Sequence, residues 1–339
     1  MMESSPAEDS VPLIDVHAHF VTDFYVAEAR AAGHVNPDGM PGWPEWHADS
    51  QVAFMDRHGI GTALLSVSSP GTHFGDDDAA RSLSRRVNEF AAAMHVRYRG
   101  RFGHLAALPL PDIEGALIEA AHALDVLQAD GVAIQSNHHG TYPGDPRFEP
   151  LWEELDRRSA VVFVHPTSPP HADAVALGRP RPMLEFLFDS ARAASDLVLS
   201  GVLARHPGIS WVFTHCGGVL PALTDRLDLF RFVLPKPAGG SDDSVREQLG
   251  DLWYDLAGTP FPHQAPALAA AFGTGRLLYG SDSCWTPDFV VEAHLRSLDT
   301  APPAIRGGHL ACPHHIQRPP TATPHSRLPH IAATANLET

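Results

Sequence analysis

The chain has 339 residues, a net charge of −16 and 44% hydrophobic residues, enough for one large domain or two small ones with a substantial core. This acidic balance, without any basic block, argues against nucleic acid and anionic membrane surfaces as partners. No apolar run reaches the roughly 18 residues of a membrane span, the acidic first ten residues lack a signal-peptide pattern, and three cysteines make no disulfide framework. We therefore expect a cytoplasmic protein.

Short apolar, β-branched runs alternate with longer helical patterns along the chain. After the run that begins at residue 13, the others lie at 62–69, 101–110, 131–137, 160–168, 209–218, 252–258 and 276–283. Between them, 112–128 begins with an Asp in N-cap position and 190–207 ends in a basic turn and a proline, which are helix boundaries. Eight strands with intervening helices predict a (β/α)8 TIM barrel. A doubly wound sheet is the alternative, but no GxGxxG motif follows the first strand.

The first strand, "LIDVHAHF" at 13–20, carries two histidines one residue apart. On a strand, residues two apart face the same way, whereas on a helix this pair would splay about 200° apart. His17 and His19 can therefore close on one ion at the end of the strand. An isolated HxH is more often a hydrogen-bonded or surface pair, so the choice depends on what else converges there.

Three further strand ends carry ligand or proton-transfer residues: His165, His215 and Asp282. Chemistry in such barrels sits at the C-terminal ends of the strands. Strands one and eight are neighbours in a closed barrel, so Asp282 is expected beside the histidine pair, and His165 can complete the set from strand five. Three imidazoles and one carboxylate suit zinc, with manganese or iron(II) possible.

The fourth strand ends in Gln135, and the only lysine, Lys236, lies in a loop after strand six. A binuclear centre of this architecture often uses a carboxylated lysine on strand four, so we predict a mononuclear site. His215 precedes Gly217 and Gly218 and is a general acid/base candidate. The alternatives for His215 are a fifth ligand or a core histidine.

Several loops at this end of the barrel bear on the ligand. The insertion 21–48 is predicted to form a lid, in which Trp43 and Trp46 suggest an apolar or aromatic ligand. In the loop beyond strand five, Arg179 and Arg181 are candidates to clamp a carboxylate. His138 and His139 lie on a rim loop that is either solvated or in contact with substrate.

The motifs "DVHAHF", "VVFVHPTS", "FTHCGGVLP" and "LLYGSDS" occur in this order, and with them the chain resembles the amidohydrolase-related decarboxylases, which include aminocarboxymuconate-semialdehyde decarboxylase. The resemblance covers roughly residues 12–300 and is closest in look to the 6-methylsalicylate decarboxylase branch. It implies His17, His19, His165 and Asp282 as metal ligands, and His215 as the catalytic histidine. It also implies non-oxidative decarboxylation of a small aromatic or unsaturated acid; the alternative is a mononuclear metal-dependent hydrolase or hydratase.

The predicted organisation is a flexible N-terminus at 1–11, the barrel at 12–300 and a Pro/His-rich tail at 301–339. The composition of the tail buries little apolar surface, so we expect it to be disordered, and a divergent or frame-shifted terminus would explain it. His215 and Asp282 are the predicted proton donors, a small carboxylic acid is the predicted substrate, and a homodimer or homotetramer is expected.

Overall fold

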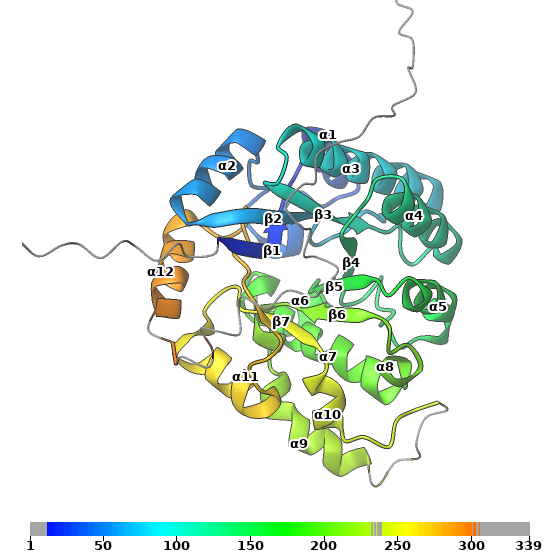
Figure 1. Cartoon of the computed structure of the whole chain (residues 1–339). Helices are drawn as coiled ribbons and strands as arrows, with labels where there is room; N and C mark the ends of the chain where they lie inside the picture. The colour runs from blue at the N-terminus through cyan, green and yellow to red at the C-terminus, as the bar shows by residue number, and fades with distance from the viewer. Residues whose placement is uncertain are drawn as a thin grey trace, which may run out of the picture.

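The structure is a computed structural model that describes residues 12–231, 233, 235, 239–299, 301–302 and 305 (Figure 1). Its strands run parallel and pair in sequence order from β1 to β8, which confirms the (β/α)8 barrel. Their bounds are β1 Leu13–His19, β2 Ile60–Ser66, β3 Phe102–Ala107, β4 Gly131–Gln135, β5 Val161–His165, β6 Ser210–Phe213, β7 Trp253–Asp255 and β8 Leu277–Leu278.

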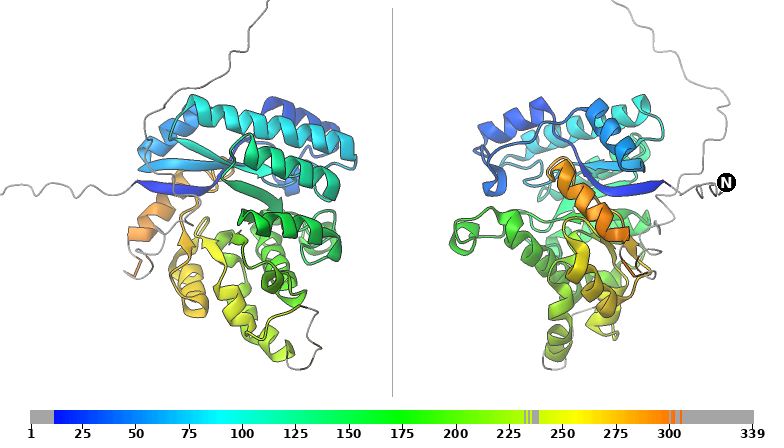
Figure 2. Two further views of the ribbon diagram at one scale, coloured as in Figure 1. Left: turned by 45° about the vertical axis from the view of Figure 1, so that its right-hand side comes forward. Right: turned by 90° about the vertical axis from the view of Figure 1, so that its left-hand side faces the viewer.

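Helices follow the strands and form the outer layer, as two turned views show (Figure 2). The α-helices are α1 Asp23–Ala31, α2 Ala48–Arg57, α3 Asp77–Arg97, α4 Ile113–Asp125, α5 Glu149–Arg157, α6 Ala172–Val175, α7 Glu185–Leu199, α8 Val202–Arg205, α9 Leu220–Arg231, α10 Val245–Gly250, α11 Ala265–Phe272 and α12 Asp288–Asp299. Short turns of helix are η1 Pro37–Gly39, η2 Pro146–Phe148, η3 Arg181–Met183, η4 His215–Gly217 and η5 Pro260–Gln264.

The barrel closes between its first and last strands. Val16 N donates to Tyr279 O at 3.0 Å, and parallel bridges join Asp15 to Tyr279 and Ala18 to Ser283. This closure carries the segment after β8 past the end of β1, so residues 265 positions apart along the chain lie side by side there; Asp282 N donates to His17 O at 2.8 Å.

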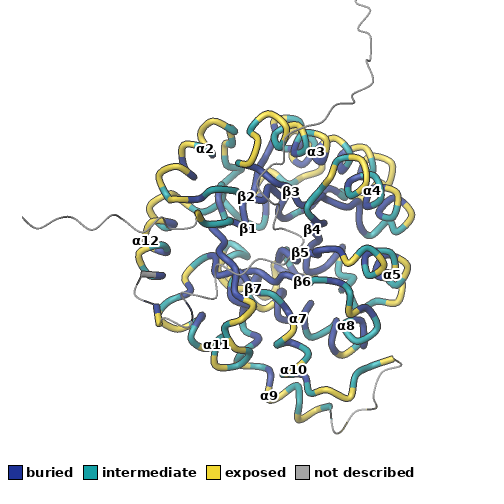
Figure 3. The backbone as a smooth tube through the Cα atoms, in the orientation of Figure 1, coloured by how far each residue is buried: buried dark blue, intermediate teal, exposed yellow. Residues whose placement is uncertain are grey.

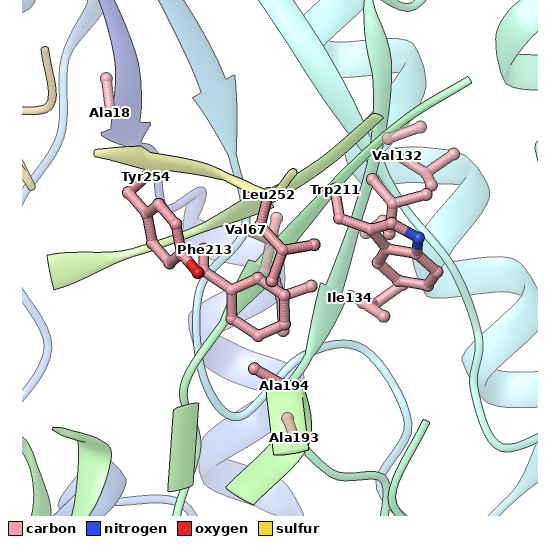
Figure 4. Packing of buried hydrophobic residues seen from close by; sticks show 14 of the residues in the cluster. Ala18, Val67, Val132, Ile134, Ala193, Ala194, Trp211, Phe213, Leu252 and Tyr254 are labelled. Carbon is pink, nitrogen blue, oxygen red and sulfur yellow. The ribbon is translucent and has the colours of Figure 1, made fainter. Parts of the chain in front are cut away.

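Two apolar layers hold the barrel together. The inner layer fills the lumen with buried side chains from the strands, among them Val16, Leu64, Phe163 and Leu278. The outer layer lies between strands and helices, and Figure 4 shows part of it, including Trp211 and Phe213 of β6. The strands are accordingly buried on both faces, while the helices expose their outer faces (Figure 3), as parallel sheets require.

A β-bulge in β1 sets the direction of its histidines. Asp15 pairs with Ala63 and Ala18 with Leu65, so three steps on β1 match two on β2. Val16 belongs to the inner layer, and the His17 ring lies 5.1 Å from the Phe163 ring of that same layer. The extra residue thus lets the apolar start of β1 and its histidines both face the lumen, a common use of bulges beside functional sites.

Some predicted elements differ in extent. The helix expected at 190–207 is two helices, α7 and α8, because Gly201 between them adopts φ +79°, a conformation that favours glycine. The insertion 21–48 holds α1 and η1. The N-cap predicted for 112–128 is present, with Asp112 accepting from Gly115 N.

Residues 1–11 and 306–339 of the predicted termini lie outside the described residues. Ala301 and Ile305, from the start of the predicted tail, are buried in the core. Across the described part of the chain, we find no helix whose length and apolar character would let it cross a membrane.

Candidate functional site

The structure brings His17, His19, His165 and Asp282 together at the C-terminal mouth of the barrel. One ligand atom from each lies within 4.8 Å of the others. The two Nε2 atoms of His17 and His19 are 2.9 Å apart, and each lies 3.3 Å from Oδ1 of Asp282. The His165 ring stands edge-on to the His19 ring at 4.7 Å. Histidine nitrogens and a carboxylate oxygen gathered this closely mark a place for a cation.

Each imidazole is oriented by a partner on its other nitrogen. His17 Nδ1 pairs with Asp255 Oδ2 at 2.8 Å, His19 Nδ1 with Ser66 Oγ at 3.0 Å, and His165 Nδ1 with Pro166 O at 2.7 Å. These partners fix the Nδ1–H tautomer and leave Nε2 facing the common centre. Such outer partners accompany metal-binding histidines as a rule.

The charges of the site favour a bound cation. Burial lowers the pKa of His19 and holds that of His165 well below its usual range, so both imidazoles are neutral. Burial also opposes protonation of His17, but the carboxylates of Asp255 and Asp282 outweigh it and raise its pKa to about 10. Despite burial, the neighbouring histidines hold the pKa of Asp282 well below its ordinary value. The carboxylates of Asp255 and Asp282, which favour protonation of His17, would also attract a divalent ion.

His215 stands beside this group on η4, after β6. Its Nε2 lies 3.5 Å from Asp282 Oδ2, and its Nδ1 is buried without a partner among the described residues. The backbone N–H of His215 donates to Asp255 Oδ1 at 2.9 Å. Asp282 thus turns Oδ1 toward the histidine pair and Oδ2 toward His215, which links the candidate ligands to the candidate acid.

The loop after His215 depends on its glycines. Gly218 adopts φ +61° and lies against the backbone of Leu187, while a Cβ on Gly217 would lie 2.8 Å from the Tyr254 ring. Only glycine fits both places. The turn allows His215 to leave β6 and point back over the barrel mouth.

A cavity of about 370 Å³ lies over this group and reaches His165, His215 and Asp282. One wall is apolar and comes from η3 and the helices after β5 and β8, with Met183, Phe186, Leu187 and Val290. No arginine or lysine of the described chain lines it. A negatively charged ligand in this cavity would therefore need the metal to balance its charge.

The lid prediction needs two corrections. Trp43 and Trp46 do not line the cavity: Trp43 Nε1 donates to His34 O at 2.8 Å, and Trp46 packs on Phe90. The aromatic wall comes instead from Trp285, whose Nε1 donates to Ser68 Oγ at 2.8 Å. Both indoles are partly buried, and Trp43 packs on Trp285, so it supports the aromatic wall without lining the cavity.

The predicted carboxylate clamp is also wrong for this cavity. Arg181 pairs with Asp173, and neither Arg179 nor Arg181 lines the space above the histidines. Arg181, His138 and His139 line a second cavity. In η3, Met183 lines the first cavity and Arg181 lines the second, so the helical turn directs the arginine away from the metal group.

Asp255 is the functional residue that the sequence analysis does not include. It is fully buried at the end of β7 and contacts both His17 and His215. The signal is present in "LWYDLAG", since an acidic residue inside an apolar strand is buried only when paired. Its partner lies 238 positions away, which pattern reading along one strand does not reveal.

The chain is similar to proteins of a known family. The sequence profile of the amidohydrolase family matches residues 14–329. The decarboxylase yanB of Aspergillus niger is 36% identical over 304 residues, which cover 84% of this chain and 81% of that protein. The 6-methylsalicylic acid decarboxylase acuB of Aspergillus aculeatus is 33% identical over 87% of this chain and 91% of its own length.

Among solved structures, a dihydroxybenzoic acid decarboxylase of Polaromonas, with bound manganese and the inhibitor 2-nitroresorcinol, superimposes with a TM-score of 0.75. It is 22% identical, and the match covers 88% of this chain and 94% of that one, so it shows the shared barrel. Because the family profile covers most of the sequence and the similar relatives match along most of their length, this chain belongs to the amidohydrolase family.

Proposed function

We propose that this protein is a metal-dependent, non-oxidative decarboxylase of a small aromatic carboxylic acid. The observation that carries the proposal is the joint placement of His17, His19, His165, Asp282 and His215 under one cavity whose described lining has no cationic side chain. The decarboxylases yanB and acuB, both above 30% identity, support it.

The ligands of the ion would be His17, His19, His165 and Asp282. The donor set of three neutral imidazoles and one carboxylate fits a divalent metal, and zinc accepts this set readily; manganese, bound in the Polaromonas relative, is the second candidate. When bound, such an ion neutralises an anionic substrate and orients it without any change of redox state. The missing lysine on β4 supports one ion per chain.

The chain's own residues then supply the proton. As the bond between ring and carboxyl carbon breaks, its electron pair stays on the ring carbon, which takes a proton while neutral carbon dioxide leaves. His215 and Asp282 are the proton donors that we propose; both line the cavity, and His215 Nε2 lies 3.5 Å from Asp282 Oδ2. Positioned acid–base groups of this kind contribute about 10²–10⁴-fold to a rate.

The cavity supports a ring substrate of the 6-methylsalicylate type. Its apolar wall of Met40, Met183, Phe186 and Leu187 suits an aromatic ring with a methyl group. Trp285 and the lid residue Pro37 add further apolar surface to this lining. Excluding water at this place favours the loss of an uncharged molecule from a charged one.

The test is release of carbon dioxide from a panel of ortho-hydroxybenzoates by the metal-replete enzyme. We expect 6-methylsalicylate to yield 3-methylphenol with one solvent deuterium at the vacated carbon. Esters, lactones and amides should be inert. Turnover of a lactone or amide, with no carbon dioxide from any hydroxybenzoate or muconate-type acid, would establish the hydrolase alternative instead.

A homodimer or homotetramer in the cytoplasm is part of the proposal. Large apolar side chains of the segment after β5 are exposed, among them Leu177, Met183 and Phe188, and such patches are typical of interfaces between subunits. Light scattering coupled to size exclusion measures the assembly. A monomer at micromolar concentration would contradict this part.

A further inference from the structure

A second cavity, of about 640 Å³, opens beside the first over the ends of β3, β4 and β5. A thin partition separates the two. Ser69, which lines the first cavity, shares a hydrogen bond of 2.7 Å with Thr167, which lines the second. Asp38 lines both cavities and accepts from Ser168 Oγ at 2.6 Å. The two cavities are therefore adjacent.

Two buried polar atoms of this cavity have no partner among the described residues: Oε1 of Gln135 and Nε2 of His138. Both residues are more than nine-tenths buried, at 6% and 7% exposure, and both line the cavity. Buried polar groups are nearly always satisfied. A ligand hydroxyl can satisfy either atom, because it donates to an amide oxygen and accepts from an imidazole N–H.

Asp38 and Arg181 are the carboxylate and the guanidinium of the described lining; they carry opposite charges, and Arg181 is already paired with Asp173. Burial lowers the pKa of the lining residues His34 and His139. Burial lowers the pKa of His138 to about 3, so this imidazole is neutral at physiological pH. The ligand that fits is uncharged.

The remaining walls suit a flat apolar ring. Leu108, Leu110, Ile134 and the prolines 70, 169 and 170 supply aliphatic surface. The exposed His139 and His171 stand at the rim, where the cavity meets solvent. An apolar body with one hydroxyl group can contact this aliphatic surface and one of the two unpartnered polar atoms.

We infer that the second cavity is a binding site for a neutral phenol, distinct from the metal site. This identification of the ligand rests on the proposed function, since decarboxylation turns an anionic hydroxybenzoate into an uncharged phenol. The two molecules differ in charge, so they favour different sites. The anionic acid binds at the metal, and the neutral phenol binds in the second cavity. The site would receive the product after it passes the Ser69–Thr167 partition.

Equilibrium dialysis of the metal-replete enzyme against 3-methylphenol tests this site without reference to turnover. Gln135→Met keeps the side-chain length but removes the acceptor, and His138→Phe keeps a ring but removes the nitrogen. Each change should weaken phenol binding roughly two- to tenfold, the loss that corresponds to one neutral hydrogen bond. His171→Ala, at the exposed rim of the same cavity, should leave binding unchanged and serves as the matched control.

Metal content and melting temperature, measured on every variant, show whether it is folded. If one of the two variants fails to fold, the other still tests the site. Phenol bound equally by the wild type and by the Gln135 and His138 variants would show that it binds elsewhere, and no binding at all would show that the cavity does not take it; either result would overturn the inference. Decarboxylation without phenol binding that depends on Gln135 refutes the second site alone. Phenol binding that depends on Gln135, in an enzyme that decarboxylates no acid, supports the site and refutes the proposed reaction.

Discussion

His17 is held on both sides by residues distant in sequence. Asp255 Oδ2 accepts from its Nδ1 at 2.8 Å, and Gly280 packs so closely that an added Cβ would lie 2.8 Å from His17 Cβ. The same Asp255 carboxylate also accepts from the backbone of His215. One buried carboxylate therefore positions a candidate ligand and the candidate acid together.

Asp255→Ala should lower metal affinity by about 10- to 100-fold, the usual cost of losing a hydrogen-bond partner of a metal-binding histidine. Isothermal titration with zinc and manganese measures it. Asp288→Ala removes a carboxylate from the exposed cluster of His58, Asp288 and Glu292 and should leave the tight site unchanged. Equal affinities for both variants would contradict the role of Asp255.

Gly280→Ala should also weaken metal binding, because the new methyl group has to push His17 or Asp255 out of place. The matched control is Gly275→Ala, in the loop before β8, where a Cβ meets nothing within 4 Å. Both changes remove the same backbone freedom, so their difference isolates the steric effect. Metal content after dialysis distinguishes them, and full occupancy in Gly280→Ala would refute the argument.

His215→Ala should keep the metal and lose about 10²–10⁴-fold in turnover, because proton transfer by a placed side chain accounts for that range. Asp282→Asn should lose metal and activity together, since one carboxylate oxygen faces the histidine pair. Elemental analysis beside carbon dioxide release separates the two results. If His215→Ala lost the metal and Asp282→Asn kept it, their roles would be exchanged.

The histidines and Asp282 could be predicted because each stands at the end of an apolar run, where alternation and barrel order fix the direction of the side chain. Asp255 and Trp285 could not. The role of Asp255 lies in contacts with His17 and His215 on other strands, and the place of Trp285 depends on how the chain turns after β8. Trp43 and Trp46 show the converse: their position after β1 suggested a ligand wall, but they pack on Trp285 and Phe90 outside the cavity.

At the scale of elements, the bulge in β1 is the clearest feature that sequence alternation does not give. Strict alternation places Ile14, Val16 and Ala18 on one face and both histidines on the other. The extra residue between Asp15 and Ala18 puts Val16 and His17 on the same side. His17 and His19 still face one centre as predicted, and their Nε2 atoms are 2.9 Å apart.

Helices α5 and α8 are joined by one ion-pair cluster. Glu149, at the start of α5, accepts from Arg205 through both carboxylate oxygens at 2.7 Å and lies 2.9 Å from His206 Nε2. Hydrogen bonds from Arg205 are the main reason why the pKa of Glu149 falls from an ordinary 4.5 to about 2. A bidentate arginine pair of this kind is stronger than a single contact.

The pH dependence of stability follows from that lowered pKa. Below about pH 4.5 the unfolded chain takes up a proton on Glu149 that the folded chain refuses until about pH 2, so the stabilisation is complete above this window and is lost as pH falls through it. The wild type should therefore exceed Glu149→Gln in unfolding free energy at pH 6, and the gap should close toward pH 2. Glu153→Gln, exposed on the same helix, should differ little from the wild type at either pH. A gap for Glu149→Gln that stayed constant with pH would contradict the pairing.

For the whole molecule, the order of strands was predictable because eight apolar runs alternate with helical patterns at regular spacing. The end of the domain was harder to predict. The Pro/His-rich composition after residue 300 predicts a tail, yet Ala301 and Ile305 are 1% and 4% exposed and extend the core past α12. Composition averages over the segment, whereas burial is decided by single apolar residues that reach a neighbouring surface.

The candidate metal site also spans the barrel. Its ligands come from the first strand, from β5 and from the turn after β8, so an ion bound there ties the strand that begins the barrel to the segment that closes it. An ion that binds only the folded chain stabilises it by about 2.7 kcal/mol at a concentration 100 times its dissociation constant. In a chain of 339 residues, with an unfolding entropy of about 2.1 cal/mol/K per residue, that corresponds to roughly 4 °C in melting temperature.

Chelation should therefore lower the melting temperature by that amount, and added zinc or manganese should restore it. His165→Ala, which removes the β5 ligand, should melt at the same temperature with and without metal. His58→Ala, in the exposed cluster with Asp288 and Glu292, should respond as the wild type does, because a site between α2 and α12 does not join the two ends of the barrel to β5. If His58→Ala abolished the response and His165→Ala retained it, the ion that stabilises the fold would sit in the exposed cluster, and the proposed ligand set would fall.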